Sequence, residues 1–313
     1  MTDIQKSSFT RYYGLPNGAA KAYFVCQKYL NHNQNALFVT AAETDDFDNA
    51  AREFAPRGAQ TFSLPQTDTG RMNSLYELLS GGHAGPRLLS AHYEDLTVPL
   101  PDPAEFRTRL FTVKRGATLR RQELLDRLEE NGYTREDYAE APGQYAARGS
   151  VVDIFCLNRP EPLRLYFAGN RVDVISAFDL DTQNTKEHVD EAVVIPLKFA
   201  EMPAALADYT AQYAFVFDEP DKEFDLQDYP DAAVTTLLPA VDGIDCQLKA
   251  NIAFNANFSL LDKEIASLQA QDMTVTLCCL NRGELDRMTE LAADYPHLKK
   301  ALFKISPLTQ GFY

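Results

Sequence analysis

GQYAARGSVVDIFCLNRPEPLRLYFAGNRVDVISAFDLDTQNT, residues 143–185, is read as a series of short β-strands. β-Branched and aromatic residues dominate 151–155, and apolar residues alternate with polar ones over 163–167. Gly169-Asn170 separates this run from the apolar residues at 172–175, and a turn between two such runs indicates a β-hairpin. The stretch therefore predicts a β-rich domain in the middle of the chain.

The composition is that of a folded chain with several domains. The 313 residues, 45% hydrophobic and 24% charged, suffice for two or three domains with cores of their own. No apolar run of about 18 residues is present, and the N-terminus lacks the apolar segment of a secretory signal. We therefore expect no membrane partner and a cytoplasmic location.

Cysteine and histidine usage gives no sign of a metal centre. The five cysteines are scattered without a CxxC pair, and the five histidines have neither HxH nor HxxxH spacing. Free thiols in a reducing cytosol are expected, because zinc sites and disulfide frameworks need closely spaced ligands or paired cysteines. We expect no metal and no other cofactor in this chain.

The charge of the chain argues against nucleic acid as a general partner. A net charge of −15 repels phosphate, although residues 107–127 carry seven Arg and Lys side chains against Glu123 and Asp126. Two interpretations of this basic segment stay open. It is a solvated face with the basic side of one helix, or it is a basic edge that faces an acidic partner.

Residues 1–105 alternate between helix and strand signals. Helical patterns cover 19–30, 47–54 and 72–79, and apolar strand-like runs cover 36–40, 61–64 and 88–91. This order favours βαβ units and an α/β domain similar to a nucleotide-binding domain. Prolines at positions 99, 101 and 103 break the periodicity, and we interpret them as a boundary.

The rest of the chain is expected to contain three parts. Residues 106–197 form the β-rich domain, in which Thr118 caps a helix over 119–131 that ends at Gly132. Residues 198–248, with a strand at 214–217, return to the first α/β domain. Residues 249–313 form a small, incomplete α/β domain, with helices over 258–269 and 281–293 and strands over 273–280 and 302–305. The expected fold class is thus multidomain α/β.

A phosphate-binding loop would lie at Gly14-Leu-Pro-Asn-Gly18-Ala-Ala-Lys21, just before the first helical pattern. Counted from Gly14, the motif GxxxxGK[ST] requires Gly, Lys and Ser/Thr where the chain has Ala19, Ala20 and Lys21. Without the motif lysine and the hydroxyl that holds Mg²⁺, the charge of a phosphate is left uncompensated. We therefore predict a degenerate nucleotide site without ATP hydrolysis.

Asp218-Glu219 follows the strand at 214–217 and looks like the acidic end of a Walker B strand. A hydrophobic strand that ends in Asp-Glu-Pro is also an ordinary exit from a strand into a turn. We assign Asp218 and Glu219 to the same degenerate site as Gly14, Gly18 and Lys21.

Three motifs carry a resemblance to a known family: GQYAARGSVVDIF from residue 143, PLRL from 162 and FDLDTQNT from 178. In these motifs the chain resembles the UvrA-binding domain shared by the excision-repair protein UvrB and the transcription-repair coupling factor (Mfd). Gly14-Leu15-Pro16 looks like the P-loop remnant of the coupling factor, and residues 304–312, KISPLTQGF, resemble part of its small α/β domain. The chain is thus similar to the N-terminal UvrB-homology region of a bacterial coupling factor.

The resemblance implies a docking surface for UvrA. Carried over motif by motif, Arg148 of AxRG and Arg164 of PxRL are the arginines that face UvrA, and arginine suits this task because its planar fork forms bidentate bonds. From the residues alone, an alternative stays open. Both arginines would hold the fold together by pairing with Asp153 or Asp173.

The chain departs from the family pattern beside these arginines. Ala168 stands where the family has an exposed aromatic residue, and Asn170-Arg171 replaces an acidic pair. Tyr166 should share a face with Ala168, since side chains two residues apart in a strand point the same way. Tyr166 and Ala168 are therefore included in the predicted docking surface.

The expected function is an interaction module, not an enzyme, that recruits UvrA to stalled transcription complexes for nucleotide-excision repair. The resemblance also implies that an RNA-polymerase-binding domain and an ATP-driven translocase on double-stranded DNA lie beyond Tyr313 in a full-length protein. Two alternatives stay open. One is a UvrB-like ATP-dependent DNA-damage-binding protein, and the other is a stand-alone paralogue that binds another partner through residues 107–127.

Overall fold

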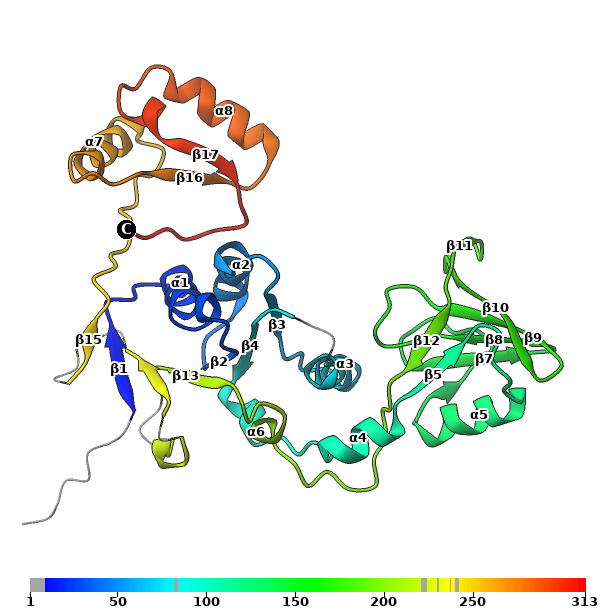
Figure 1. The fold of residues 1–313 in the computed structure, drawn as a ribbon. Helices are drawn as coiled ribbons and strands as arrows, with labels where there is room; N and C mark the ends of the chain where they lie inside the picture. Colours follow the sequence, from blue (N-terminus) through cyan, green and yellow to red (C-terminus); the bar gives the residue numbers. More distant parts are fainter. Residues whose placement is uncertain (1–8, 82–83, 221–223, 230, 237, 240–241) are drawn as a thin grey trace, which may run out of the picture. The chain divides into compact units, whose positions relative to one another are not determined.

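The computed structural model describes residues 9–81, 84–220, 224–229, 231–236, 238–239 and 242–313 (Figure 1). The chain divides into two compact units. The first holds Met1–Ser63, Ala84–Tyr93 and Gln212–Tyr313, and the second holds Leu64–His83 and Glu94–Ala211. The four-part division expected from the sequence stays a prediction.

The first unit is built on a seven-stranded sheet in which all described strand pairs are parallel. The strand order is β15-β1-β14-β13-β2-β4-β3. The strands are β1 (Thr10–Tyr13), β2 (Ala36–Thr40), β3 (Gln60–Ser63), β4 (Arg87–His92), β13 (Ala214–Asp218), β14 (Ala233–Thr235) and β15 (Ile244–Asp245). All five residues of the central strand β2 are buried, as a parallel strand covered on both faces requires.

Helices α1 (Gly18–Lys28) and α2 (Asp45–Phe54) pack against each other and against this sheet. The helix α1 starts because the Asn17 side chain accepts a hydrogen bond from the amide of Ala20. Phe47 of α2 stacks on Phe38 of β2, with 3.8 Å between the ring centroids. A short 3₁₀-helix, η1 (Leu30–His32), joins α1 to β2. The α/β pattern predicted for this part of the chain is confirmed.

A second α/β segment of the same unit contains the parallel strand pair β16 (Thr276–Cys279) and β17 (Leu302–Ile305). Its helices are α7 (Phe258–Gln269), α8 (Arg282–Ala292) and the 3₁₀-helix η4 (Leu298–Lys300). The strand predicted over 273–280 is shorter in the structure. The amide of Met273 bonds to the carbonyl of Leu268 and so belongs to the turn that closes α7.

The second unit carries a six-stranded sheet with the order β11-β10-β9-β8-β7-β6. The strands are β6 (Thr134–Arg135), β7 (Gln144–Arg148), β8 (Val151–Ile154), β9 (Leu163–Ala168), β10 (Arg171–Phe178) and β11 (Thr185–His188). The neighbours are antiparallel except β6 and β7. Gly169, with φ of +62°, lies in the turn between β9 and β10, so the predicted hairpin is confirmed.

One face of this sheet covers a core shared with α5 (Arg121–Glu130) and the antiparallel pair β5 (Phe111–Lys114) and β12 (Glu191–Val194). The unit also contains α3 (Asp68–Leu79) and α6 (Leu206–Tyr209). The 3₁₀-helix η2 (Tyr93–Leu96) begins at Tyr93, which belongs to the first unit, and continues into the second. The 3₁₀-helix η3 (Leu226–Asp228) follows β13 and belongs to the first unit.

In this unit the sequence analysis missed one helix and misplaced one helix cap. The proline cluster leads into a helix, α4 (Pro103–Arg109), because Pro103 fits the first turn and Asp102 Oδ1 accepts the amides of Ala104 and Glu105. Thr118 does not cap α5. It forms an isolated bridge with Arg171, and α5 begins only at Arg121.

Candidate functional site

The outer face of the six-stranded sheet carries the predicted docking residues. In β9 the side chains of Leu163, Leu165 and Phe167 point into the core, whereas Arg164, Tyr166 and Ala168 alternate with them and lie on the opposite face. Tyr166 is 40% exposed. As expected, Tyr166 and Ala168 therefore share a face, and Arg164 lies on it with them.

Asp153 of β8 lies directly opposite Arg164 of β9 in the strand register. Its carboxylate accepts hydrogen bonds from Arg164 Nε at 2.7 Å and Nη2 at 2.9 Å, a bidentate pair. Arg148 Nη2 lies 3.4 Å from the same carboxylate. The Asp153 side chain is 3% exposed, so it forms a buried anionic centre between two arginines.

Arg164 makes further contacts beyond this carboxylate. Its guanidinium lies 4.2 Å from the centroid of the Phe178 ring, and Nη2 donates to Gln183 Oε1 at 2.8 Å. The hydrogen bond to Asp153 raises the pKa of Arg164 above its ordinary value. With a side chain only 18% exposed, Arg164 is held in one orientation at the surface of the sheet.

Arg148, at the end of β7, is more open. Its side chain is 52% exposed and lies over the ring of Tyr138, 4.5 Å from the centroid. Arg135, Tyr138 and Arg148 are among the residues around a shallow hollow of about 280 Å³. Sequence reasoning missed Tyr138. Its only signal is an isolated aromatic residue in the polar segment before residue 143.

The open question of which carboxylate pairs with the arginines is answered by these contacts. Both Arg148 and Arg164 pair with Asp153, whereas Asp173 accepts a bond from Arg171 at 2.6 Å. The pairing gives the two arginines a structural role. It is compatible with docking, because the exposed part of Arg148 and the rest of the face stay open to solvent.

Several side chains of the basic segment 107–127 are engaged within the unit. Arg115 and Arg127 pair with Asp190 and Glu123, at 2.8 Å and 3.3 Å. Arg109 donates to the carbonyls of Lys198 and Glu130 and lies over Phe199. Because much of the positive charge is paired in this way, the structure favours the solvated-face interpretation of the segment.

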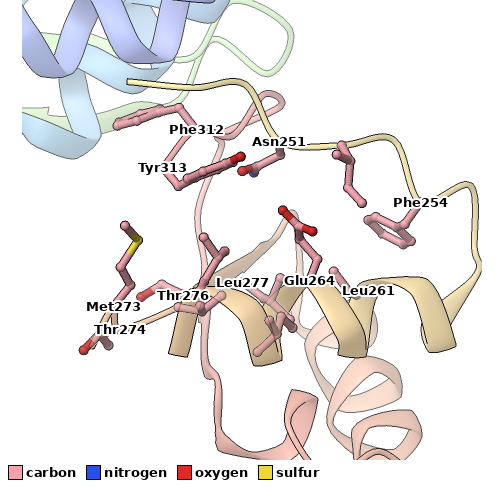
Figure 2. Close-up of a pocket in the computed structure, with 14 residues that line it drawn as sticks. Asn251, Phe254, Leu261, Glu264, Met273, Thr274, Thr276, Leu277, Phe312 and Tyr313 are labelled. Carbon is pink, nitrogen blue, oxygen red and sulfur yellow. The ribbon is translucent and has the colours of Figure 1, made fainter. Parts of the chain in front are cut away.

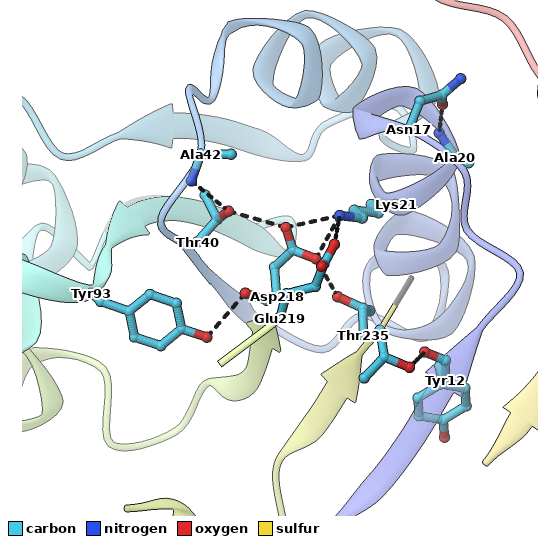
Figure 3. A network of polar contacts seen from close by, with 11 residues as sticks. Tyr12, Asn17, Ala20, Lys21, Thr40, Ala42, Tyr93, Asp218, Glu219 and Thr235 are labelled. Atoms are coloured by element: carbon cyan, nitrogen blue, oxygen red, sulfur yellow. Dashed lines mark hydrogen bonds and ion pairs between the residues drawn. The ribbon is translucent and has the colours of Figure 1, made fainter. Parts of the chain in front are cut away.

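Three residues of the predicted nucleotide site meet at the carboxyl end of β13, with Lys21 reaching from α1 to Asp218 and Glu219 (Figure 3). Lys21 Nζ, on α1, contacts Asp218 Oδ1 at 2.7 Å and Glu219 Oε1 at 3.3 Å. Thr40 and Thr235 donate to the same Asp218 carboxylate, at 3.0 and 2.7 Å. Lys21 thus supplies one positive charge to the two carboxylates from within the protein.

The two glycines of the predicted site have close neighbours within the protein. Gly14 has φ of +71°, and a Cβ there would lie 2.5 Å from Asp245 Oδ1, so the position requires glycine for the chain to turn beside β15. Gly18 begins α1, where a Cβ would lie 3.1 Å from the amide of Phe47.

A separate cavity of about 400 Å³ lies beside α7 and β16 (Figure 2). Its walls are mainly apolar, with Leu261, Leu277 and Phe312 among them, and Glu264 contributes a carboxylate. This lining offers no nucleophile paired with a base. Among the residues that the structure describes, no cluster of His, Cys, Asp and Glu could hold a metal, and no helix is long and apolar enough to cross a membrane.

The outer face of the six-stranded sheet carries Arg148 and Arg164 around Asp153, and we call it the arginine face. Residues 111–199 match the family described as the UvrB interaction domain, so the chain contains such a domain. The match overlaps the segment 106–197 that we predicted as the interaction domain.

Three relatives are similar in sequence to parts of this chain. The UvrABC system protein B of Thermus thermophilus is 43% identical over 77 residues, 25% of this chain and 12% of the relative. The transcription-repair-coupling factor of Escherichia coli is 32% identical over 107 residues, 34% of this chain and 9% of the relative. That of Staphylococcus aureus is 26% identical over 193 residues, 55% of this chain and 16% of the relative.

The chain therefore spans between 9% and 16% of the length of these relatives. The predicted similarity to the N-terminal UvrB-homology region of a transcription-repair coupling factor is confirmed.

Proposed function

We propose that this chain is a UvrA-binding module that recruits UvrA for transcription-coupled nucleotide-excision repair in the cytoplasm. The observation that carries the proposal is the arginine face of the UvrB interaction domain. Asp153 orders Arg148 and Arg164 on that face, beside the exposed ring of Tyr166. A preordered arginine loses less conformational entropy when it binds an acidic partner, and such an anchor contributes about 2 kcal/mol.

The two arginines have different parts in the proposed surface. Arg148 is the main contact, because half of its side chain is exposed. Arg164 is the more rigid of the two arginines, because it is paired with Asp153 and mostly buried. It presents the small exposed part of its side chain next to Tyr166 and Ala168. Without the exposed aromatic residue of the family at position 168, we expect weaker binding than in relatives that have it.

The first α/β unit acts in this proposal as a scaffold without ATP hydrolysis and without a cofactor. Lys21, Asp218 and Glu219 satisfy one another, so a nucleotide with Mg²⁺ would have to break an ion pair that is largely buried. This arrangement disfavours the alternative of a UvrB-like ATP-dependent protein. Equilibrium titration with a fluorescent ATP analogue and Mg²⁺ tests it, and micromolar binding would refute the scaffold role.

For a longer protein of this kind, we propose RNA polymerase and double-stranded DNA as partners and an ATP-dependent translocase as the motor. This rests on what the family resemblance of the sequence motifs implies, and the names of two relatives, each a transcription-repair-coupling factor, support it. The present residues would then supply only the contact with the excision machinery.

Titration of the chain with purified UvrA tests the proposed function. We expect saturable one-to-one binding that Arg164→Ala and Arg148→Ala weaken. No binding by the wild-type chain at micromolar concentrations would refute the docking role, whereas equal binding by both variants would refute only the residue assignment.

A further inference from the structure

The turn between β10 and β11, residues 179–184, contacts Arg164 of the arginine face through the side chain of Gln183. Gln183 Oε1 accepts a hydrogen bond from Arg164 Nη2 at 2.8 Å. The orientation of the Gln183 amide is fixed on its other side, since Nε2 donates to the carbonyl of Leu180 at 2.9 Å. A donor and an acceptor at the two ends of one amide leave a single orientation that satisfies both.

The turn holds Gln183 in an unusual backbone conformation. Gln183 has φ of +59°, in the left-handed region that residues other than glycine rarely occupy. The backbone amide of Gln183 donates to the backbone carbonyl of Asp179 at 2.8 Å. A non-glycine residue in this region is kept there by its surroundings, and it often marks a functional position.

Asp179 organises the turn from its first residue. Its Oδ1 accepts from the amide and the hydroxyl of Thr182, both at 3.0 Å, and its Oδ2 lies 3.2 Å from Lys186 Nζ. Phe178, directly before it, supplies the ring beneath the Arg164 guanidinium. The motif FDLDTQNT therefore places an aromatic ring and an amide acceptor on two sides of one arginine.

The rest of the Arg164 environment is fixed by the sheet. Asp153 accepts from Nε and Nη2, and Gln183 accepts from Nη2 as well. Asp153 alone fixes the guanidinium from the β8 side, and the turn fixes it from the β10 side. The bidentate pair with Asp153 sets the plane of the guanidinium, and Gln183 adds a second acceptor for Nη2 from another element.

We propose that Gln183 is a positioning residue, which holds the Arg164 guanidinium in the orientation that meets UvrA. The inference rests on the proposed function for its binding consequence, and on the geometry of the turn for the positioning itself. Gln183 is exposed and outside the hydrophobic core, so its substitution should leave the domain folded.

Three variants separate positioning from loop structure. Gln183→Met keeps the length of the side chain and removes the acceptor. Gln183→Glu keeps an acceptor for Arg164 but loses the donor to Leu180. Gln122→Met is the matched control, because Gln122 is an exposed glutamine of α5 that bonds Asp126 and lies on another element of the same unit.

The first readout is UvrA affinity by titration, with unchanged thermal unfolding as a check on folding. We expect Gln183→Met to weaken binding about tenfold, or roughly 1.4 kcal/mol, and Gln183→Glu and Gln122→Met to bind within about threefold of wild type. In an Arg164→Ala background, Gln183→Met should have no further effect. An equal tenfold loss in that background, or wild-type binding by Gln183→Met, would overturn the proposal.

The second readout does not depend on UvrA. In a ¹⁵N spectrum of the chain, the Nη2–H signals of Arg164, the group that donates to Gln183 Oε1, should exchange slowly with solvent in the wild type and in Gln183→Glu, and several-fold faster in Gln183→Met. An unchanged exchange rate in Gln183→Met would overturn positioning even if UvrA binds. Slow exchange in a chain that does not bind UvrA would instead retain the positioning role and refute the proposed function.

Discussion

Asp153 accepts two hydrogen bonds from Arg164, at 2.7 Å from Nε and 2.9 Å from Nη2, between neighbouring strands of the six-stranded sheet. The same carboxylate also pairs with Arg148. A buried carboxylate is costly unless hydrogen bonds and opposite charge compensate it, and here two arginines do so. The two residues that the family motifs single out for docking are therefore also coupled to each other through one acid.

Loss of Asp153 should destabilise the domain. Asp153→Ala leaves two arginines without their common partner, and removing one member of a buried ion pair costs about 3 kcal/mol. Urea denaturation followed by circular dichroism measures the change. Asp173→Ala is the control, because its pair with Arg171 is exposed and should contribute about 0.5 kcal/mol or less. Equal changes in the two variants would contradict the buried-centre interpretation.

Removal of Arg148 should affect binding far more than folding. Its side chain is 52% exposed, and truncation of such an anchor should weaken UvrA binding about 30-fold, or roughly 2 kcal/mol. Arg115→Ala is a matched control, since Arg115 is 55% exposed and also forms an ion pair. Biolayer interferometry compares the two variants. Similar dissociation constants for both would argue against Arg148 as a contact.

An aromatic side chain at position 168 should strengthen binding. Ala168 lies on the exposed face with Arg164 and Tyr166, so Ala168→Phe adds apolar surface without disturbing the core. We expect a gain in UvrA affinity of about tenfold and an unchanged melting temperature. If Ala168→Phe binds no better than wild type, the partner does not contact this part of β9.

The turn at 179–184 should depend on pH in a defined window. The hydrogen bond from the Thr182 amide, together with Lys186, lowers the pKa of Asp179 from 3.8 to about 2. Because the folded pKa is depressed, the turn is fully stabilised above the unfolded pKa and loses this contribution as pH falls from 3.8 towards 2.

The Thr182 amide resonance reports this transition in a pH titration by NMR. It should keep its shift and protection until the pH approaches the folded pKa and change with a midpoint near pH 2. In Asp179→Asn this change should be absent. A Thr182 resonance that moves near neutral pH would show that another group controls the turn.

Lys21 should matter for stability rather than for nucleotide binding. Lys21→Met leaves the buried Asp218 carboxylate without its cation, and we expect a loss of about 3 kcal/mol in the free energy of unfolding. Lys263→Met, on the exposed side of α7, is the control and should have little effect. Tighter ATP binding by wild type than by Lys21→Met would contradict the role of Lys21 as an internal counter-ion.

Much of the fold could be predicted from local patterns. The apolar run of β2, the hairpin turn at Gly169-Asn170 and the helix α7 follow from hydrophobic periodicity and turn residues, which act over a few positions. Short strands such as β1 and β15 were missed, since four or fewer residues give too little pattern. The start of α4 was missed because prolines end most periodic patterns but also favour the first turn of a helix.

The sequence by itself determined the interaction-domain motifs, the failure of the phosphate-binding loop and the two candidate arginines. Only the tertiary structure decided what those residues contact. Lys21 meets Asp218 from 197 positions away, and Arg164 meets both Asp153 and Gln183, because strand order and register bring distant positions together. Periodicity encodes which face a side chain takes, whereas the partner across that face depends on how the strands are paired.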